Sequence, residues 1–180
     1  MFCANDYSVQ AAAFFRPLIV RLSASGALLW ANLYDIGTPA VNTIIREFME
    51  DPATGNLYFT GREAGVGGVL FGVVSSAGVL LRAVAISNGA SAEGVALSLT
   101  ANGNFLIGGG TTLPAQGNRD LLFLELTATG SVVRAFAMGV AQDDLIRVMR
   151  RTGDVFTAIG FSRHSDDRRL DAVLATFGYD

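Results

Sequence analysis

The sequence is poor in the side chains that most often bind metals or carry covalent chemistry. Its 180 residues include one cysteine, Cys3, and one histidine, His164; lysine is absent, so arginine supplies all thirteen basic side chains. A lone cysteine excludes an internal disulfide framework and a thiolate metal site, and a lone histidine excludes a site of several imidazoles. The sequence therefore predicts no cofactor and no metal site.

The net charge and the lengths of the hydrophobic runs argue against nucleic acid and membrane as partners. The formal net charge is −3, and the only close basic pairs are Arg150–Arg151 and Arg168–Arg169, so there is no basic stripe for a nucleic acid. No apolar run approaches the ~18–20 residues of a membrane-spanning helix, so no membrane partner is expected. Residues 1–15 lack both a basic segment and a long apolar core, and we do not expect them to form a signal peptide.

What the sequence does contain is a repeat of about fifty residues. One phrase is a turn of small residues ending in glycine, with copies 52 residues apart at Gly26, Gly78 and Gly130 and a weaker fourth copy at Gly178. A second phrase, DPATGNLYFTG at 51–61, returns as LTANGNFLIGG and as MRRTGDVFTAIG. Two anchors that recur together predict a repeat architecture.

Each period contains four short strand-like runs. Within residues 42–86 they are NTIIREFM, NLYFTGRE, GVLFGVV and VLLRAVAI, each bounded by turn residues. Four short antiparallel strands in a repeat of this length predict an all-β fold of β-propeller blades. A β-sandwich and a parallel β-helix stay open as alternatives, although a sandwich explains no fifty-residue repeat and the coils of a β-helix are shorter.

The phrase order resembles the bacterial SBBP-type β-propeller repeat and, more distantly, the NHL repeat. The residues of the first repeat that carry the resemblance are Trp30, Asp51, Gly55, Asn56, Tyr58, Thr60 and Gly61. Later copies have Arg82 and Arg134 in place of Trp30. The resemblance implies that the inner strand of each blade precedes the Asp-x-x-Gly-Asn turn, and it favours a secreted or cell-surface bacterial protein.

With that strand order, residues 1–180 form one partial propeller domain of about 3.5 blades. Its pieces are 1–36, 41–87, 92–138 and 143–180, the first without an inner strand and the last without an outer strand. We expect either a fragment of a larger propeller or a chain that completes its ring by self-association, because open sheet edges favour pairing with another chain.

The expected loops are tight on one edge of the blades and longer on the other, and binding residues generally lie on such longer loops. The long loops are expected at 35–41, 62–68, 87–94, 109–120, 139–144 and 162–171. Their candidate binding residues are Glu93, Asp143, Asp144, Arg163, His164, Asp166 and Asp167. Carboxylates gathered there could bind a cation or flank a glycosidic bond. A solvated loop edge is the simpler interpretation.

Two arginines are further candidates. The segments IIREFM and LIRVMR align, so Arg46 and Arg147 take the same position on two inner strands, where the middle copy is expected to have Leu97. In a central channel such arginines could bind an anion or a carboxylate ligand. The simpler interpretation is a structural arginine paired with Glu47, Glu50 or a carbonyl.

No pattern for nucleophilic catalysis is present, because the sequence has no G-x-S-x-G segment and its glycine-rich strings precede no helix. We therefore expect a non-enzymatic binding module that recognises protein, peptide or glycan through the long-loop edge. The alternatives are a structural spacer of a large surface protein, or a propeller-type hydrolase or lyase that uses Asp143, Asp144 and Asp166 as acid and base.

Overall fold

The computed structural model describes residues 2–7, 14–37, 41–87, 89–112, 118–139, 143–163 and 170–178. Within these ranges the chain forms fourteen strands and no helix. The strands are β1 (Phe2–Tyr7), β2 (Phe15–Leu22), β3 (Leu28–Leu33), β4 (Thr43–Glu50), β5 (Leu57–Glu63), β6 (Gly68–Val74), β7 (Leu80–Ile86), β8 (Ser91–Leu99), β9 (Phe105–Thr112), β10 (Arg119–Leu126), β11 (Val132–Met138), β12 (Asp143–Thr152), β13 (Val155–Arg163) and β14 (Leu170–Gly178).

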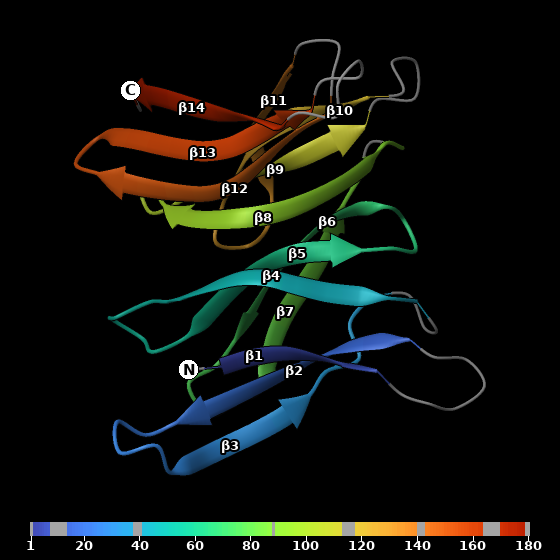
Figure 1. The fold of residues 1–180 in the computed structure, drawn as a ribbon. Coiled ribbons are helices and arrows are strands. Elements are labelled where there is room, and N and C mark those ends of the chain that lie inside the picture. Colours follow the sequence, from blue (N-terminus) through green and yellow to red (C-terminus); the bar gives the residue numbers. More distant parts are fainter. Residues whose placement is uncertain are drawn as a thin grey trace.

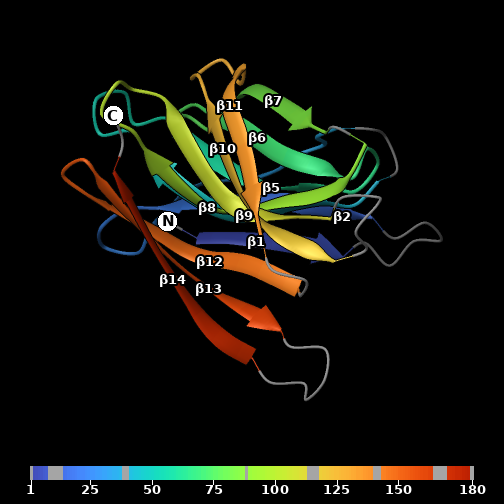
Figure 2. The same ribbon diagram turned by 90° about the horizontal axis from the view of Figure 1, so that it is seen from above.

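The strands form four antiparallel sheets that stack along the molecule (Figure 1). Two sheets have four strands, in the orders β4-β5-β6-β7 and β8-β9-β10-β11, and the sheets at the two ends, β1-β2-β3 and β12-β13-β14, have three. Seen from above, successive sheets are rotated relative to one another (Figure 2). Stacked, four-stranded antiparallel sheets in sequence order are propeller blades, so the all-β propeller prediction is confirmed.

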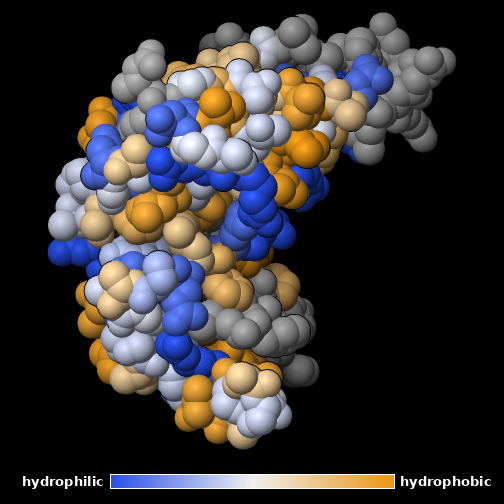
Figure 3. Space-filling view, turned by 90° about the vertical axis from the view of Figure 1, so that its left-hand side faces the viewer, coloured by the Kyte–Doolittle hydropathy of each residue, from blue (hydrophilic) through white to orange (hydrophobic). Residues whose placement is uncertain are grey.

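The inner strands of neighbouring blades, β4, β8 and β12, lie next to one another. The equivalent strands show how the end sheets are incomplete. The first sheet corresponds to the second, third and outer strands of a blade, and the last sheet to the inner, second and third strands. In side view the body is a crescent that is hollowed on one side (Figure 3).

A β-bulge in every inner strand explains why the repeated phrase ends in glycine. The register of β4, β8 and β12 shifts at Arg46, Val95 and Arg147, respectively. The partner strand has glycine at each bulge: a Cβ on Gly61, Gly109 or Gly160 would overlap the carbonyl oxygen of the inner strand. The bulge aligns Arg46 with Val95, so the expected alignment of Arg46 with Leu97 was wrong by two residues.

The turn glycines of both repeated phrases have a backbone conformation that side chains rarely adopt. Gly26, Gly78 and Gly130 have φ values of 85°, 84° and 81° in the turns between third and outer strands. In the other turn, next to Gly55 with φ of 68°, Asp51 accepts hydrogen bonds from Thr54 and the Ala53 amide, which lower the pKa of its carboxyl group.

Several details of the expected loops were wrong. The candidate residues expected on long loops, Glu93, Asp143, Asp144 and Arg163, lie in the strands β8, β12 and β13. Gly178 is not a fourth turn glycine but the last residue of β14, where its φ is not positive. The expected long loop at 62–68 is a four-residue turn at 64–67, because β5 runs to Glu63 and β6 begins at Gly68. The reason is the same in these two cases: antiparallel pairing within the sheet extends the strands into the expected turn or loop.

The core is divided into three clusters, one between each pair of neighbouring sheets. Phe59 packs towards the first sheet, whereas Tyr58, its neighbour on β5, packs towards the third sheet on Phe105, with the ring centroids 4.2 Å apart. Side chains alternate along a strand, so each blade uses both faces of its sheet. The blades therefore hold one another together through their faces.

Polar contacts from the outer strands add to these clusters. The indole of Trp30 donates to the Ser76 carbonyl of the next blade at 3.0 Å, and Arg82, which replaces Trp30 in the next repeat, donates to the Thr129 carbonyl at 3.2 Å. The buried Tyr34 hydroxyl donates to the Gly78 carbonyl at 2.8 Å, and burial raises the pKa of this phenol. The residue type changes between repeats, but the contact with the following turn is kept.

Candidate functional site

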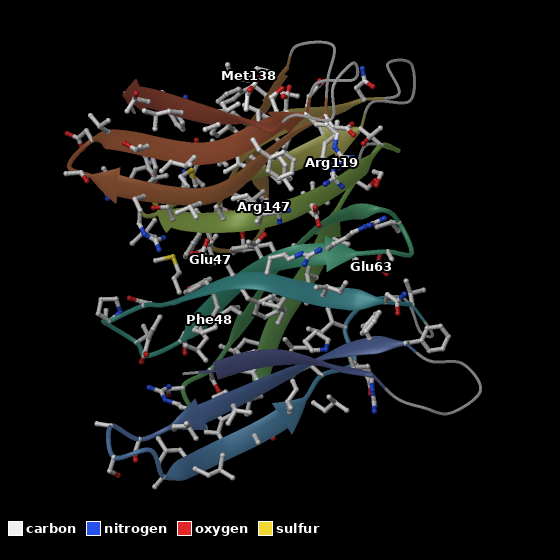
Figure 4. All side chains as sticks on the ribbon, in the orientation of Figure 1. Glu47, Phe48, Glu63, Arg119, Met138 and Arg147 are labelled. Atoms are coloured by element: carbon white, nitrogen blue, oxygen red, sulfur yellow. The ribbon has the colours of Figure 1, made fainter. Side chains whose placement is uncertain are left out.

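A cleft of about 560 Å³ opens at the long-loop edge, between the third blade and the last sheet. Its lining residues are Thr112, Arg119, Asp143, Asp144, Leu145, Arg147, Phe161 and Arg163. They come from the end of β9, the start of β10, the start of β12 and the end of β13. Antiparallel pairing brings these strand ends to one edge, on the side where Figure 4 shows Arg119 and Glu63.

Arg147 is the bulge residue of β12, and it lines this cleft. Its guanidinium lies over the ring of Phe161, 5.1 Å from the centroid. Within the described ranges no carboxylate pairs with Arg147 or with Arg163, which lines the same cleft. A guanidinium on an aromatic ring gains about 0.5–1 kcal/mol at an exposed site and keeps its N–H donors for other partners.

Arg46, at the same bulge position on β4, has a different environment. Its guanidinium lies 3.3 Å from one carboxylate oxygen of Glu93, and the guanidinium of Arg119 lies 2.9 Å from the other. Glu93 is buried and its carboxylate is held from both sides. Arg46 is therefore paired, as the simpler interpretation expected, but its partner is Glu93 of the next blade instead of Glu47 or Glu50.

The glycine run 108–110 lets Arg119 reach Glu93. Gly110 lies opposite Glu93 in β9, and a Cβ there would come within 2.6 Å of the Arg119 side chain. The aliphatic stem of Arg119 thus crosses β9 where that strand has no side chain. The positions equivalent to Gly110 in the neighbouring sheets hold Arg62 and Phe161, so this crossing is possible only in the third blade.

The two adjacent aspartates of β12 have different environments. Asp143 is exposed, and its carboxylate accepts a hydrogen bond from the Arg119 amide at 3.0 Å. Asp144 is buried, and one of its carboxylate oxygens lies close to Gly139, as does the carboxylate of Asp120. No group of three or more His, Cys, Asp or Glu side chains that could hold a metal ion occurs in the described part of the chain.

Glu47 is a polar residue whose contacts sequence reasoning missed. Its carboxylate accepts a hydrogen bond from the Leu97 amide at 2.8 Å and lies 3.5 Å from the guanidinium of Arg150. It therefore connects the three inner strands β4, β8 and β12, and Figure 4 shows it on the inner side of the stack. Because Leu97 lies 50 positions away, only the stacking of blades brings the two together.

The predicted site residues divide into three groups. Asp143, Asp144, Arg147 and Arg163 share the cleft, whereas Arg46 and Glu93 form an ion pair beside it. His164, Asp166 and Asp167 lie outside the described residues. Thr112, Arg119 and Phe161 line the cleft but were not predicted as site residues. Thr112 and Arg119 fall in the expected loop 109–120, but nothing in the sequence marked Phe161.

Comparisons with known proteins identify the fold but no family. No protein-family model matches the chain, and no curated protein sequence matches it. A periplasmic gluconolactonase from Pseudomonas aeruginosa has a similar structure, with a TM-score of 0.52 and 13% sequence identity over 98% of this chain and 53% of that one. A β-1,3-galactosidase of family GH43 has a TM-score of 0.53 and 10% identity over 97% and 42% of the two chains.

Both similar structures are propeller-type folds, and at these identities the likeness concerns the fold alone. The chain spans about half the length of each of them. In the described residues no helix is long and apolar enough to cross a membrane.

Proposed function

We propose that this propeller is a non-enzymatic binding module that recognises an acidic glycan in the cleft at its long-loop edge. The observation that carries the proposal is Arg147, whose guanidinium stands in a cleft of about 560 Å³ with an aromatic ring beneath it and no carboxylate on it within the described residues. A cleft of that size accommodates a small ligand.

The chemistry of the lining supports a ligand with both a carboxylate and hydroxyl groups. Arg147 and Arg163 supply N–H donors in the planar geometry that a ligand carboxylate accepts. The exposed carboxylate of Asp143 and the hydroxyl of Thr112 can accept from and donate to sugar hydroxyls. A sugar acid carries both kinds of group in one small molecule, whereas a neutral sugar offers the two arginines hydroxyl acceptors but no negative charge.

Two weaker considerations agree with this proposal. The two similar structures are, by their names, proteins that act on sugar derivatives. The resemblance of the repeats to the SBBP type would make the chain part of a secreted or surface protein, where glycans are accessible.

The test is a titration of the protein with glucuronate, and with glucose as the neutral counterpart, in which binding is measured by calorimetry or NMR. We expect glucuronate to bind more tightly than glucose and Arg147→Ala to weaken glucuronate binding by about tenfold or more, the loss of a charged hydrogen-bonded partner. The matched control is Arg46→Ala, which removes the same side chain at the equivalent bulge. Equal binding of the two sugars, or equal losses in both variants, would contradict the proposal.

A hydrolase is the second candidate, because Asp143 and Asp144 line the same cleft. Two carboxylates beside a glycosidic bond are the minimum equipment of a glycoside hydrolase. Incubation with oligosaccharides of glucuronate and galacturonate, analysed by mass spectrometry, distinguishes the two candidates. Shortened products that disappear in Asp143→Asn would favour the hydrolase, and intact oligosaccharides would favour the binding module.

A further inference from the structure

The last sheet has an uncovered hydrophobic face, which we call the C-terminal face. It consists of Val148 on β12, Ile159 on β13, and Ala172 and Leu174 on β14, all of them exposed. Ile159 and Leu174 are paired across the two strands, with 49% and 69% of their surfaces exposed. Two directly opposed large apolar residues in water are unusual in a sheet that also has a buried face.

The register shows what normally covers this face. Ile159 precedes the bulge glycine Gly160, as Thr60 and Gly108 precede theirs, and the residues paired with these three are Leu174, Phe71 and Phe123. Phe71 is 0% exposed and Phe123 is 1% exposed, and each lies in the cluster shared with the following sheet. Leu174 thus occupies the position at which the second and third sheets bury Phe71 and Phe123 against the sheet that follows each of them.

The opposite end of the molecule presents the other half of such an interface. On β2, Leu18, Val20 and Leu22 point away from the body; we call them the N-terminal face. Leu22 is 39% exposed, whereas its counterparts Val74 on β6 and Leu126 on β10 are completely buried against the preceding sheet. The two end faces therefore correspond to the two sides of one interior blade interface.

We propose that the C-terminal face binds the N-terminal face of a second copy of this chain, in the arrangement in which interior sheets pack. The contact is head-to-tail, so it leads either to a closed ring or to an open filament. Because the chain spans 53% and 42% of two propeller-type chains, two copies have about the length of one such chain. The assembly is therefore a closed dimer with two identical head-to-tail interfaces.

The junction does not place a carboxylate of the second copy on Arg147. The first sheet has no inner strand in the described part of the chain, so the second copy places no counterpart of Glu93 opposite Arg147. Arg147 therefore still lines the cleft in the dimer. The dimer does not depend on ligand binding, and its failure would leave the function of the cleft untouched.

The experiment measures molar mass by light scattering after size exclusion, over a range of protein concentrations. The wild type is expected at twice the chain mass of 18.9 kDa. Leu174→Asp and Leu22→Asp should each raise the dissociation constant by about 30-fold or more, the size of a hot-spot loss. The matched control is Leu81→Asp on the outer strand β7, where the side chain is 54% exposed but lies on neither end face.

Mixing the two variants tests the head-to-tail arrangement. Each variant keeps the face that the other has lost, so an equimolar mixture of Leu174→Asp and Leu22→Asp should form a dimer with one intact interface. A face-to-face dimer would be broken by only one substitution and would not be restored by mixing. A monomeric wild type at tens of micromolar, a concentration-dependent filament, or equal loss in Leu81→Asp would overturn the proposal; circular dichroism confirms that each variant is folded.

Discussion

The interface between the second and third blades and the uncovered C-terminal face are built from equivalent positions, but they differ completely in burial. Phe71 lies at the centre of the first and is inaccessible to water, whereas Leu174 lies at the same place in the second and is largely exposed. Both residues are apolar and both lie on the third strand of their sheets. The difference teaches that in a repeat fold the neighbouring repeat, and not the residue, decides burial.

The two bulge arginines show the same dependence on the neighbouring blade, here for a charged side chain. Arg46 has a following blade, and the buried Glu93 of that blade pairs with it. Arg147 has no following blade among the described residues, and it lies on Phe161 of its own sheet instead. The same side chain at the same local geometry is thus paired with a carboxylate in one blade and, among the described residues, packed on an aromatic ring in another.

The largest expected effect comes from comparing two equivalent positions, Phe71 in a covered interface and Leu174 on the C-terminal face. Phe71→Ala removes a fully buried ring and should lower the free energy of unfolding by about 3–5 kcal/mol. Leu174→Ala, in the monomer, should change it by no more than about 0.5 kcal/mol. Urea unfolding of dilute protein measures both. A similar loss in the two variants would mean that Leu174 is covered even in the single chain.

A second pair of substitutions examines the bulge, a contact within one sheet that should not depend on the neighbouring blade. Gly61→Ala and Gly160→Ala each place a Cβ against an inner-strand carbonyl of their own sheet, so both should cost about 1–3 kcal/mol, in the covered blade and in the last sheet alike. Gly178→Ala is the control, because a Cβ there has nothing within 4 Å and φ is not positive. Unfolding midpoints in urea should fall for the first two variants only; an unchanged Gly160→Ala would show that the bulge relaxes at an open end.

The smallest effect concerns the interface between the first two sheets, which has a buried tyrosine where the next interface has Ile86. The pKa of Tyr34 is raised by burial, so its neutral hydroxyl stabilises the folded state fully below the ordinary value of 10.0. As pH rises above 10.0 and through the raised pKa, this contribution is lost. The free energy of unfolding of Tyr34→Phe should therefore fall less steeply above pH 10 than that of the wild type. Unfolding at each pH is monitored by the fluorescence of Trp30. Parallel profiles for the variant and the wild type would contradict this assignment.

Much of the architecture could be predicted from the sequence because the repeated positions have local causes. Gly78 and Gly130 have the positive φ that their turns require. Because each repeat needs a glycine in this turn, the glycines recur at a regular spacing in the sequence. The alternation of Tyr58 and Phe59 towards opposite faces follows from strand geometry. The bulge was not predicted, although an extra residue shifts the alternation of side chains: Ile45 and Phe48, three positions apart, pack in the same cluster. The alignment of Arg46 with Leu97 was wrong because the bulge positions are unequally spaced, 49 residues from Arg46 to Val95 and 52 from Val95 to Arg147.

The candidate site was only partly accessible to sequence reasoning. Asp143, Asp144 and Arg163 were identified because they fall in or beside expected long loops, and Arg147 because two copies of the repeat align; the structure places all four around one cleft. Phe161 was not identified, since an aromatic residue in a strand is normally a core residue. That its ring lies under the Arg147 guanidinium and lines the cleft is seen only in the tertiary structure.

The sequence by itself determined the blade: the strand lengths, the turns at Gly26, Gly55 and their copies, and the alternation of apolar side chains. These features depend on backbone conformation and on neighbours within one repeat, which the order of residues encodes directly. The tertiary structure decided which face of each blade is covered and therefore which arginine is paired. That outcome depends on contacts about fifty residues apart, such as the one between Arg46 and Glu93, and these exist only once the blades are stacked.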